Sequence, residues 1–125
     1  MNTQEVANHC IALFRKGDFQ AAHDQFYADD IVSIEPTGAR LEIVQGRDAI
    51  AKKGQEWQAM LEKVHSSEVS DPLVAENFFS CTMKMVVDIK GGPKELNMDE
   101  VCVFEVKEGK VVKEQFFYTP VPQPA

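Results

Sequence analysis

The sequence predicts an α+β protein in which three N-terminal helices pack in a strongly curved antiparallel sheet, and two observations lead to this prediction. Residues 79–89 alternate between apolar and polar side chains, the period of a strand with one buried face. Residues 4–16, 19–26 and about 47–63 instead carry apolar residues every three or four positions, which is typical of amphipathic helices. Helices followed by long strands indicate the α+β class, and a twisted sheet can wrap around the helices as a cone.

Length and composition favour one small domain of an ordinary globular kind. The 125 residues predict a single domain over residues 1–119, followed by an extended Pro-rich tail over residues 120–125. The net charge of −7 argues against a nucleic-acid partner, and no apolar run approaches the roughly 20 residues of a membrane span. Three cysteines without a CxxC pair, and an N-terminus unlike a signal peptide, predict unpaired thiols and a cytoplasmic location.

The three helices follow from capping residues and apolar stripes. Thr3 is the predicted N-cap of the first helix, and Gly17 ends it. Asp18 is the predicted cap of a short second helix, whose apolar stripe includes His23. A buried histidine needs partners for two ring nitrogens, so we interpret His23 as a partly buried structural residue. The third helix presents Ile50, Gly54, Trp57 and Leu61 on one face.

Strands account for the remaining regular structure. Residues 31–35 form a short strand that Pro36 closes, and residues 41–44 suit a brief second strand. His65 is predicted to open the next strand. A meander of three long strands follows, with turn signals at Gly91-Gly92-Pro93 and at Lys107-Glu108-Gly109.

The last hairpin has two possible registers, and they expose different residues. A two-residue loop would turn Lys113 toward the face that carries Phe104. A three-residue loop with a bulge at Gly109 would turn Glu114 and Phe116 toward that face instead, because a slip of one residue exchanges the two faces. We favour the second register, since it leaves Lys113 in water.

Four local motifs in this order resemble the nuclear-transport-factor-2-like superfamily, in particular its SnoaL-like proteins. The motifs are Lys16-Gly17-Asp18, then residues 26–32, Gly46-Arg47-Asp48-Ala49-Ile50, and the hairpin at 103–112. The resemblance implies a cone-shaped fold, a pocket between helices and sheet, and a homodimer formed through the outer face of the sheet. It does not imply one activity, because the superfamily contains isomerases, dehydratases, cyclases, epoxide hydrolases and non-catalytic binding modules.

The ketosteroid-isomerase branch of the superfamily allows a comparison at single positions. Its general-base aspartate follows the first strand immediately before a proline, where this chain has Glu35-Pro36. The tyrosine and protonated aspartate that hold an oxyanion in that branch correspond to Cys10 and, most nearly, Cys102. A thiol is a weak hydrogen-bond donor. The resemblance therefore implies a base at Glu35 without the oxyanion site of that branch.

The candidate site consists of polar groups on an otherwise apolar inner face. Carboxylates there lose hydration, which raises their pKa and suits acid–base chemistry near neutral pH. Glu35 is expected to face the cavity. We predict catalytic roles for Glu35, His65, Glu114 and Tyr118, and ligand contacts from Trp57, Met83, Met85, Met98, Glu100, Phe104 and Phe116.

Two functions remain open at this point. The first is a cofactor-independent isomerase, dehydratase or cyclase that transfers a proton on an apolar or aromatic metabolite. The second is a non-catalytic module for ligand binding or dimerisation, which a methionine-rich lining would also suit. No metal site is expected, because the three histidines lie on separate elements without paired ligand spacing.

Overall fold

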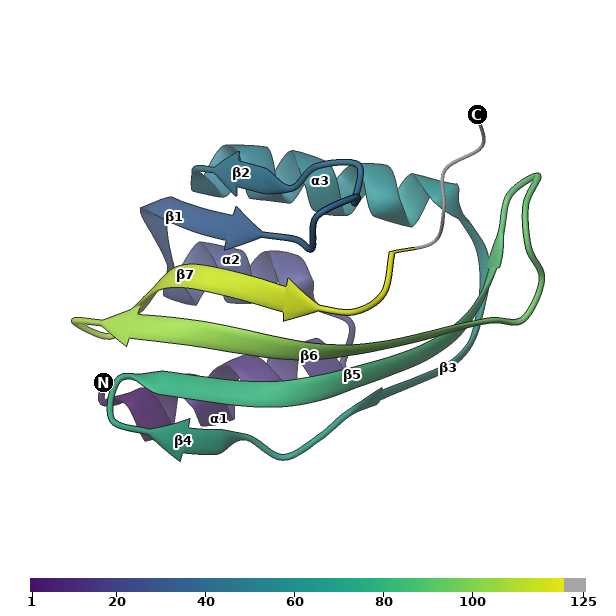
Figure 1. Cartoon of the computed structure of the whole chain (residues 1–125). Coiled ribbons are helices and arrows are strands. Elements are labelled where there is room, and N and C mark those ends of the chain that lie inside the picture. Colours follow the sequence, from purple (N-terminus) through teal and green to yellow (C-terminus); the bar gives the residue numbers. More distant parts are fainter. Residues whose placement is uncertain (121–125) are drawn as a thin grey trace.

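In the computed structural model of the chain, residues 1–120 are described, and they form three helices and one seven-stranded sheet (Figure 1). Residues 121–125, most of the predicted tail, lie outside the described residues. The elements are α1 (Thr3–Arg15), α2 (Phe19–Phe26), β1 (Tyr27–Ile34), β2 (Ile43–Gln45), α3 (Arg47–Met60), β3 (Leu61–Val69), β4 (Leu73–Ala75), β5 (Phe78–Ile89), β6 (Leu96–Lys107) and β7 (Lys110–Phe117).

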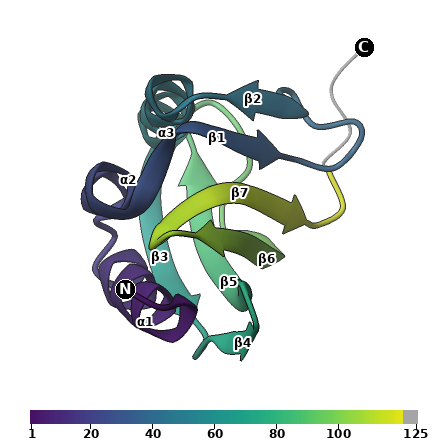
Figure 2. The ribbon, with the colours of Figure 1, turned by 90° about the vertical axis from the view of Figure 1, so that its left-hand side faces the viewer.

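The sheet runs in the order β2-β1-β7-β6-β5-β3, and β4 pairs with β5 outside this path. The sheet curves around the three helices, which lie along its concave side (Figure 2). The predicted α+β cone is therefore confirmed. One pairing makes the sheet mixed rather than purely antiparallel, because β1 runs parallel to β7 while the other strand pairs are antiparallel.

The helix ends differ from the sequence-based prediction by one to three residues. Asn2, not Thr3, caps α1: its side-chain oxygen accepts from the Glu5 amide at 2.8 Å, and the Glu5 carboxylate accepts from the Asn2 amide at 3.1 Å. This reciprocal pair is a capping box. Helix α3 ends at Met60, before the predicted end near residue 63, because Leu61 already pairs with Ile89 in the sheet. His65 therefore lies inside β3 and does not open it.

Strands β5 and β6 pair along most of their length, and this register arranges the concave face. Phe79 lies opposite Phe104, and Cys81 lies opposite Cys102. The next two pairs along this face are Met83 with Glu100 and Met85 with Met98. The first two pairs are buried, whereas the last two are only half-buried. The concave face thus passes from a closed core to a more accessible end.

The last hairpin turns Glu114 and Phe116 inward by a different route from the predicted one. The turn has two residues, Glu108 and Gly109, with φ of 52° and 75°, as a type I′ turn requires. The prediction of a three-residue loop is therefore wrong. A bulge further along the hairpin supplies the extra residue, because Val106 pairs with Val111 but Glu105 pairs with Lys113. Glu114 consequently lies opposite Phe104.

The core lies between α1, α2 and the inner face of the sheet. Phe104 stacks on Phe79 with ring centroids 4.6 Å apart and on Phe14 at 5.7 Å. The three cysteines, Cys10, Cys81 and Cys102, are free and buried in the same core. No helix among residues 1–120 is both long and apolar enough to cross a membrane.

Candidate active site

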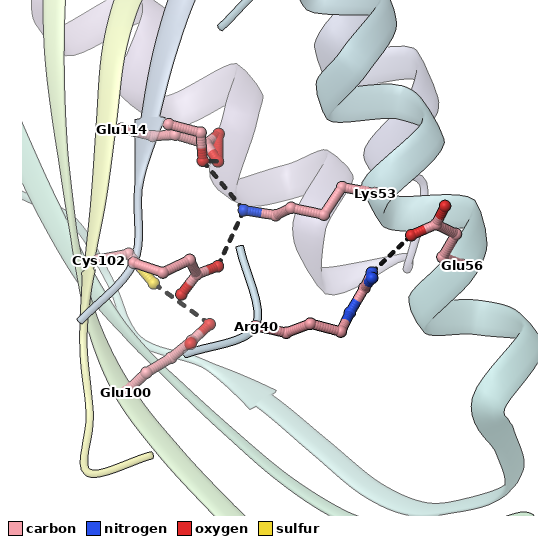
Figure 3. Close-up of polar contacts among 8 residues, drawn as sticks. Arg40, Lys53, Glu56, Glu100, Cys102 and Glu114 are labelled. Atoms are coloured by element: carbon pink, nitrogen blue, oxygen red, sulfur yellow. Dashed lines mark hydrogen bonds and ion pairs between the residues drawn. The ribbon is translucent and has the colours of Figure 1, made fainter. Parts of the chain in front are cut away.

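An ion pair between α3 and the end of β1 marks the candidate site. Lys53 follows the buried Ile50 by three residues, so its side chain leaves the same face of α3 and points toward the sheet. Its Nζ donates to Glu35 Oε1 at 2.9 Å. The two side chains are only 20% and 14% exposed, so water screens this pair less than it screens a surface pair. Figure 3 shows Lys53 reaching across from α3 toward the sheet.

A buried carboxylate lies directly behind this pair. The parallel pairing of β1 with β7 sets Ser33 beside Glu114. The Ser33 hydroxyl donates to Glu114 Oε2 at 3.0 Å, and Lys53 Nζ donates to the Ser33 Oγ at 3.2 Å. Burial raises the pKa of Glu114, while the neighbouring Tyr27 and Ser33 hydroxyls and Lys53 act in the opposite direction. Burial also raises the pKa of Tyr27 well above its ordinary value.

Glu100 is the third carboxylate, and it comes from β6. Its pKa is raised to about 7, first by burial and then by the nearby charge of Glu35. The Cys102 thiol lies 3.7 Å from Glu100 Oε1, and its weak hydrogen bond lowers the pKa against that trend. Figure 3 shows Glu100, Glu114 and Lys53 approaching one region from β6, β7 and α3. This raised pKa lets Glu100 hold its proton closer to neutral pH than an ordinary glutamate does.

Two further groups border the cluster. Tyr118 lies beside Glu35 just after β7, and burial and this carboxylate raise the pKa of the Tyr118 phenol. Arg40, in the loop between β1 and β2, forms an ion pair with Glu56 of α3 at 2.5 Å. This pair ties the loop that follows Glu35 to the helix that carries Lys53 (Figure 3).

The cluster contains more carboxylates than cations. Three carboxylates, those of Glu35, Glu100 and Glu114, share the single ammonium of Lys53. The buried oxygens Glu35 Oε2 and Glu114 Oε1 have no hydrogen-bond partner among the described residues. Like charges at close range favour protonation of some of these carboxylates, so the cluster can hold a proton near neutral pH.

A family model for the SnoaL-like domain matches residues 1–118. The chain belongs to the SnoaL-like domain family. A crystal structure from Mesorhizobium loti, named as a candidate SnoaL-like polyketide cyclase with carbohydrate phosphatase as a second designation, is 33% identical. It has a TM-score of 0.88, and the match covers 94% of this chain and 100% of that one.

More distant structures share the fold. A protein with a ketosteroid isomerase-like fold from Catenulispora acidiphila, in complex with trimethylamine, is 18% identical with a TM-score of 0.72, covering 92% of this chain and 85% of that one. An NTF2-like protein of unknown function from Burkholderia pseudomallei is 13% identical with a TM-score of 0.75, covering 95% and 92%. No curated protein matches the chain.

In this SnoaL-like domain, the predicted catalytic residues do not all come together. Glu35, Glu114 and Tyr118 lie in or beside the cluster. His65 instead bonds through Nε2 to Asp88 Oδ1 on the neighbouring strand, at 2.8 Å. The described interactions do not connect His65 to the cluster.

The predicted ligand-contact residues differ in how much of their surface is accessible. Phe104 is 1% exposed and lies between two core rings, so it offers no free surface in this structure. Phe116 packs beneath the Lys53 ammonium, 5.5 Å from Nζ to the ring centroid. The remaining residues are half-buried and keep some accessible surface: Trp57, Met83, Met85, Met98 and Glu100.

Two surface hollows lie elsewhere. One, of about 520 Å³, is lined by Arg15 and residues of β3 and β5, and the other, of about 270 Å³, lies over β4, β5 and Val103. Neither is lined by Glu35, Lys53 or Glu100. Within residues 1–120, no group of three or more His, Cys, Asp or Glu residues is arranged to hold a metal ion.

Sequence reasoning missed Lys53, Ser33 and Tyr27. Lys53 shares a helix face with Ile50 and Trp57, and this spacing was the one available signal for an inward-pointing lysine. Ser33 lies on the same side of β1 as Glu35, but its partner Glu114 is 81 residues away in the chain. Only the pairing of β1 with β7 reveals that contact.

Proposed function

We propose that this SnoaL-like domain is a cofactor-independent enzyme that transfers a proton on an apolar or aromatic metabolite. The observation that carries the proposal is the cluster of three carboxylates around one lysine, with Glu100 titrating near neutral pH. A base and an acid whose environments separate their protonation states are the usual requirement for such chemistry at pH 7.

The geometry supports Glu35 as the base and Glu100 as the acid. Lys53 is the counterion of Glu35 through Oε1, and the buried Oε2 has no hydrogen-bond partner among residues 1–120 that would keep it from accepting a proton. Glu100 forms no ion pair within residues 1–120, and its pKa of about 7 provides a protonated carboxyl group that can donate. Tyr118, beside Glu35, would assist in holding the substrate.

The substrate class follows from what surrounds the carboxylates. Half-buried methionine and aromatic side chains on the concave face suit an apolar or aromatic molecule, since methionine adapts to varied shapes. Isomerisation, dehydration and cyclisation can each start with removal of a proton beside a carbonyl group. The description of the similar Mesorhizobium loti protein as a polyketide cyclase supports the last of these.

Hydrogen exchange in D2O tests the proposal even though the product has not been identified. A panel of apolar ketones and aromatic 1,3-diketones is incubated with the protein, and loss of the α-proton signal is followed by NMR. We expect exchange with the wild type, and a loss of about 100-fold or more in Glu35→Gln, which removes the base but keeps its size. The control is Glu68→Gln, an exposed glutamate on β3, which keeps full activity.

A non-catalytic binding module is the second candidate, because Glu35 is held in an ion pair and His65 lies apart from the cluster. The same experiment separates the two functions. Panel members that bind by NMR titration yet show no exchange above the buffer rate would favour the binding module.

A further inference from the structure

Lys53 has one hydrogen-bond donor to spare. An ammonium group has three N–H donors. One goes to Glu35 Oε1 at 2.9 Å and one to Ser33 Oγ at 3.2 Å, and residues 1–120 offer no third acceptor. The side chain keeps 20% exposure. A partly buried ammonium with an unused donor is suited to receive an oxygen atom from a ligand.

Hydrogen bonds from two sides hold the ammonium in place. The single Ser33 proton is donated to Glu114 Oε2, so Ser33 can only accept from Lys53. Both Ser33 and Glu114 are almost fully buried, at 0% and 3% exposure. Glu35 holds the ammonium from a second direction. Ser33 and Glu114 are therefore positioning residues for Lys53.

The two thiols at the positions that hold an oxyanion in the ketosteroid-isomerase branch are poor donors to an oxygen. Cys10 and Cys102 are buried thiols: burial raises the pKa of Cys10 to about 12, and a hydrogen bond with Cys81 together with burial raises the pKa of Cys102. The Cys102 thiol is moreover directed at Glu100. A thiol stabilises an anionic oxygen far less than an ammonium does.

We propose, on the basis of the proposed function, that Lys53 binds the carbonyl oxygen of the ligand and stabilises it as an enolate. The ligand class is therefore an apolar molecule with a carbonyl group beside an acidic C–H bond, or its enol or phenol equivalent.

The charges in this step balance within the site. The C–H bond beside the carbonyl breaks, its proton passes to Glu35 Oε2, and its electron pair moves to the carbonyl oxygen. Glu35 becomes neutral as the ligand oxygen becomes negative. Lys53 therefore exchanges one anionic partner for another, and the total charge of ligand and cluster is unchanged.

Phenolate binding tests this role independently of turnover. The Glu35→Gln protein imitates the state after proton transfer, with a neutral side chain beside Lys53. It is titrated with 4-nitrophenol, whose phenolate is recognised by its absorbance, and with 4-nitroanisole as a neutral analogue. We expect phenolate affinity to fall about tenfold or more when Lys53→Met is added, because a charge-assisted hydrogen bond is lost. Affinity for the anisole changes less than about twofold.

The matched control adds Lys52→Met, which removes an exposed lysine from the same helix. It keeps the phenolate affinity of Glu35→Gln. Lys53→Gln is a second variant, and circular dichroism verifies that each protein is folded. Ser33→Ala should weaken phenolate binding but not anisole binding, as expected for a positioning residue.

Three outcomes overturn the proposal: no phenolate binding to Glu35→Gln, unchanged affinity in both Lys53 variants, or an equal loss with Lys52→Met. The result is separable from the proposed function. Phenolate binding through Lys53 without D2O exchange in the wild type would keep the oxygen site and reject proton transfer. D2O exchange in the wild type without a Lys53-dependent phenolate site would keep proton transfer and reject the oxygen site at Lys53.

Discussion

Glu114 is the most completely buried carboxylate of the site, and it makes stability depend on pH. Its pKa is raised in the folded protein above the ordinary value of 4.5 for a free glutamate. The folded state thus binds its proton more tightly than the unfolded state does. The resulting stabilisation is present below pH 4.5 and is lost as the pH rises through the folded pKa.

Glu114→Gln removes this titration while keeping the shape of the side chain. We expect the variant and the wild type to differ little in unfolding free energy at about pH 4.5, and the variant to gain relative to the wild type as the pH increases. Urea unfolding from about pH 4.5 to about pH 9 measures the difference. A difference that stays constant, or that moves in favour of the wild type at high pH, contradicts the assigned burial of Glu114.

Among the secondary-structure elements, the capping box of α1 allows a comparison of neighbouring residues. Asn2→Ala removes the side chain that accepts from the Glu5 amide, so it should cost about 1 kcal/mol of stability. Thr3→Ala changes the residue that the sequence favours as the cap, and it should lower the stability by only a few tenths of this amount. Denaturant midpoints of the two variants decide between the caps. A larger loss in Thr3→Ala would restore the sequence-based assignment.

The meander, and the side of its last strand that turns inward, could be predicted because they depend on local patterns. Alternation in residues 79–89 identifies the inner face, and Glu108-Gly109 provides the turn. The bulge that follows could not be located, because either side of the turn can absorb an extra residue with the same effect on Glu114. The parallel pairing of β1 with β7 joins segments about 80 residues apart, and no local signal encodes it.

The candidate site was predictable only in part for the same reason. Glu35 and Glu114 could be identified from strand faces and a family resemblance. Lys53 could not, since a lysine on a half-apolar helix face is normally solvated, and only the tertiary contact with Ser33 and Glu35 shows otherwise. Phe104 could not be distinguished from the ligand-contact residues. Helix α1 packs over it, and the alternation of a strand shows only which face a residue lies on, not whether a helix covers that face.

For the molecule as a whole, the outer face of the sheet predicts self-association. Val101 and Phe117 are paired neighbours that remain 43% and 49% exposed, and Val103 lies on the same face. Apolar residues gathered on one face favour a partner surface. We predict a homodimer, which Val103→Glu weakens without changing ligand binding, whereas Lys52→Glu on α3 has no effect. Sedimentation at high micromolar concentration measures this, and a monomeric wild type there would refute the prediction.

The proposed chemistry depends on a half-buried carboxyl group on the concave face that exchanges protons near neutral pH, and NMR titration of the glutamate side-chain carbons tests this directly. The wild type should contain one carboxyl that titrates at about pH 7, and this signal should be absent from Glu100→Gln. Wild-type spectra in which no carboxyl titrates near neutral pH, or in which that titration persists in Glu100→Gln, would contradict the assignment of Glu100 as the acid.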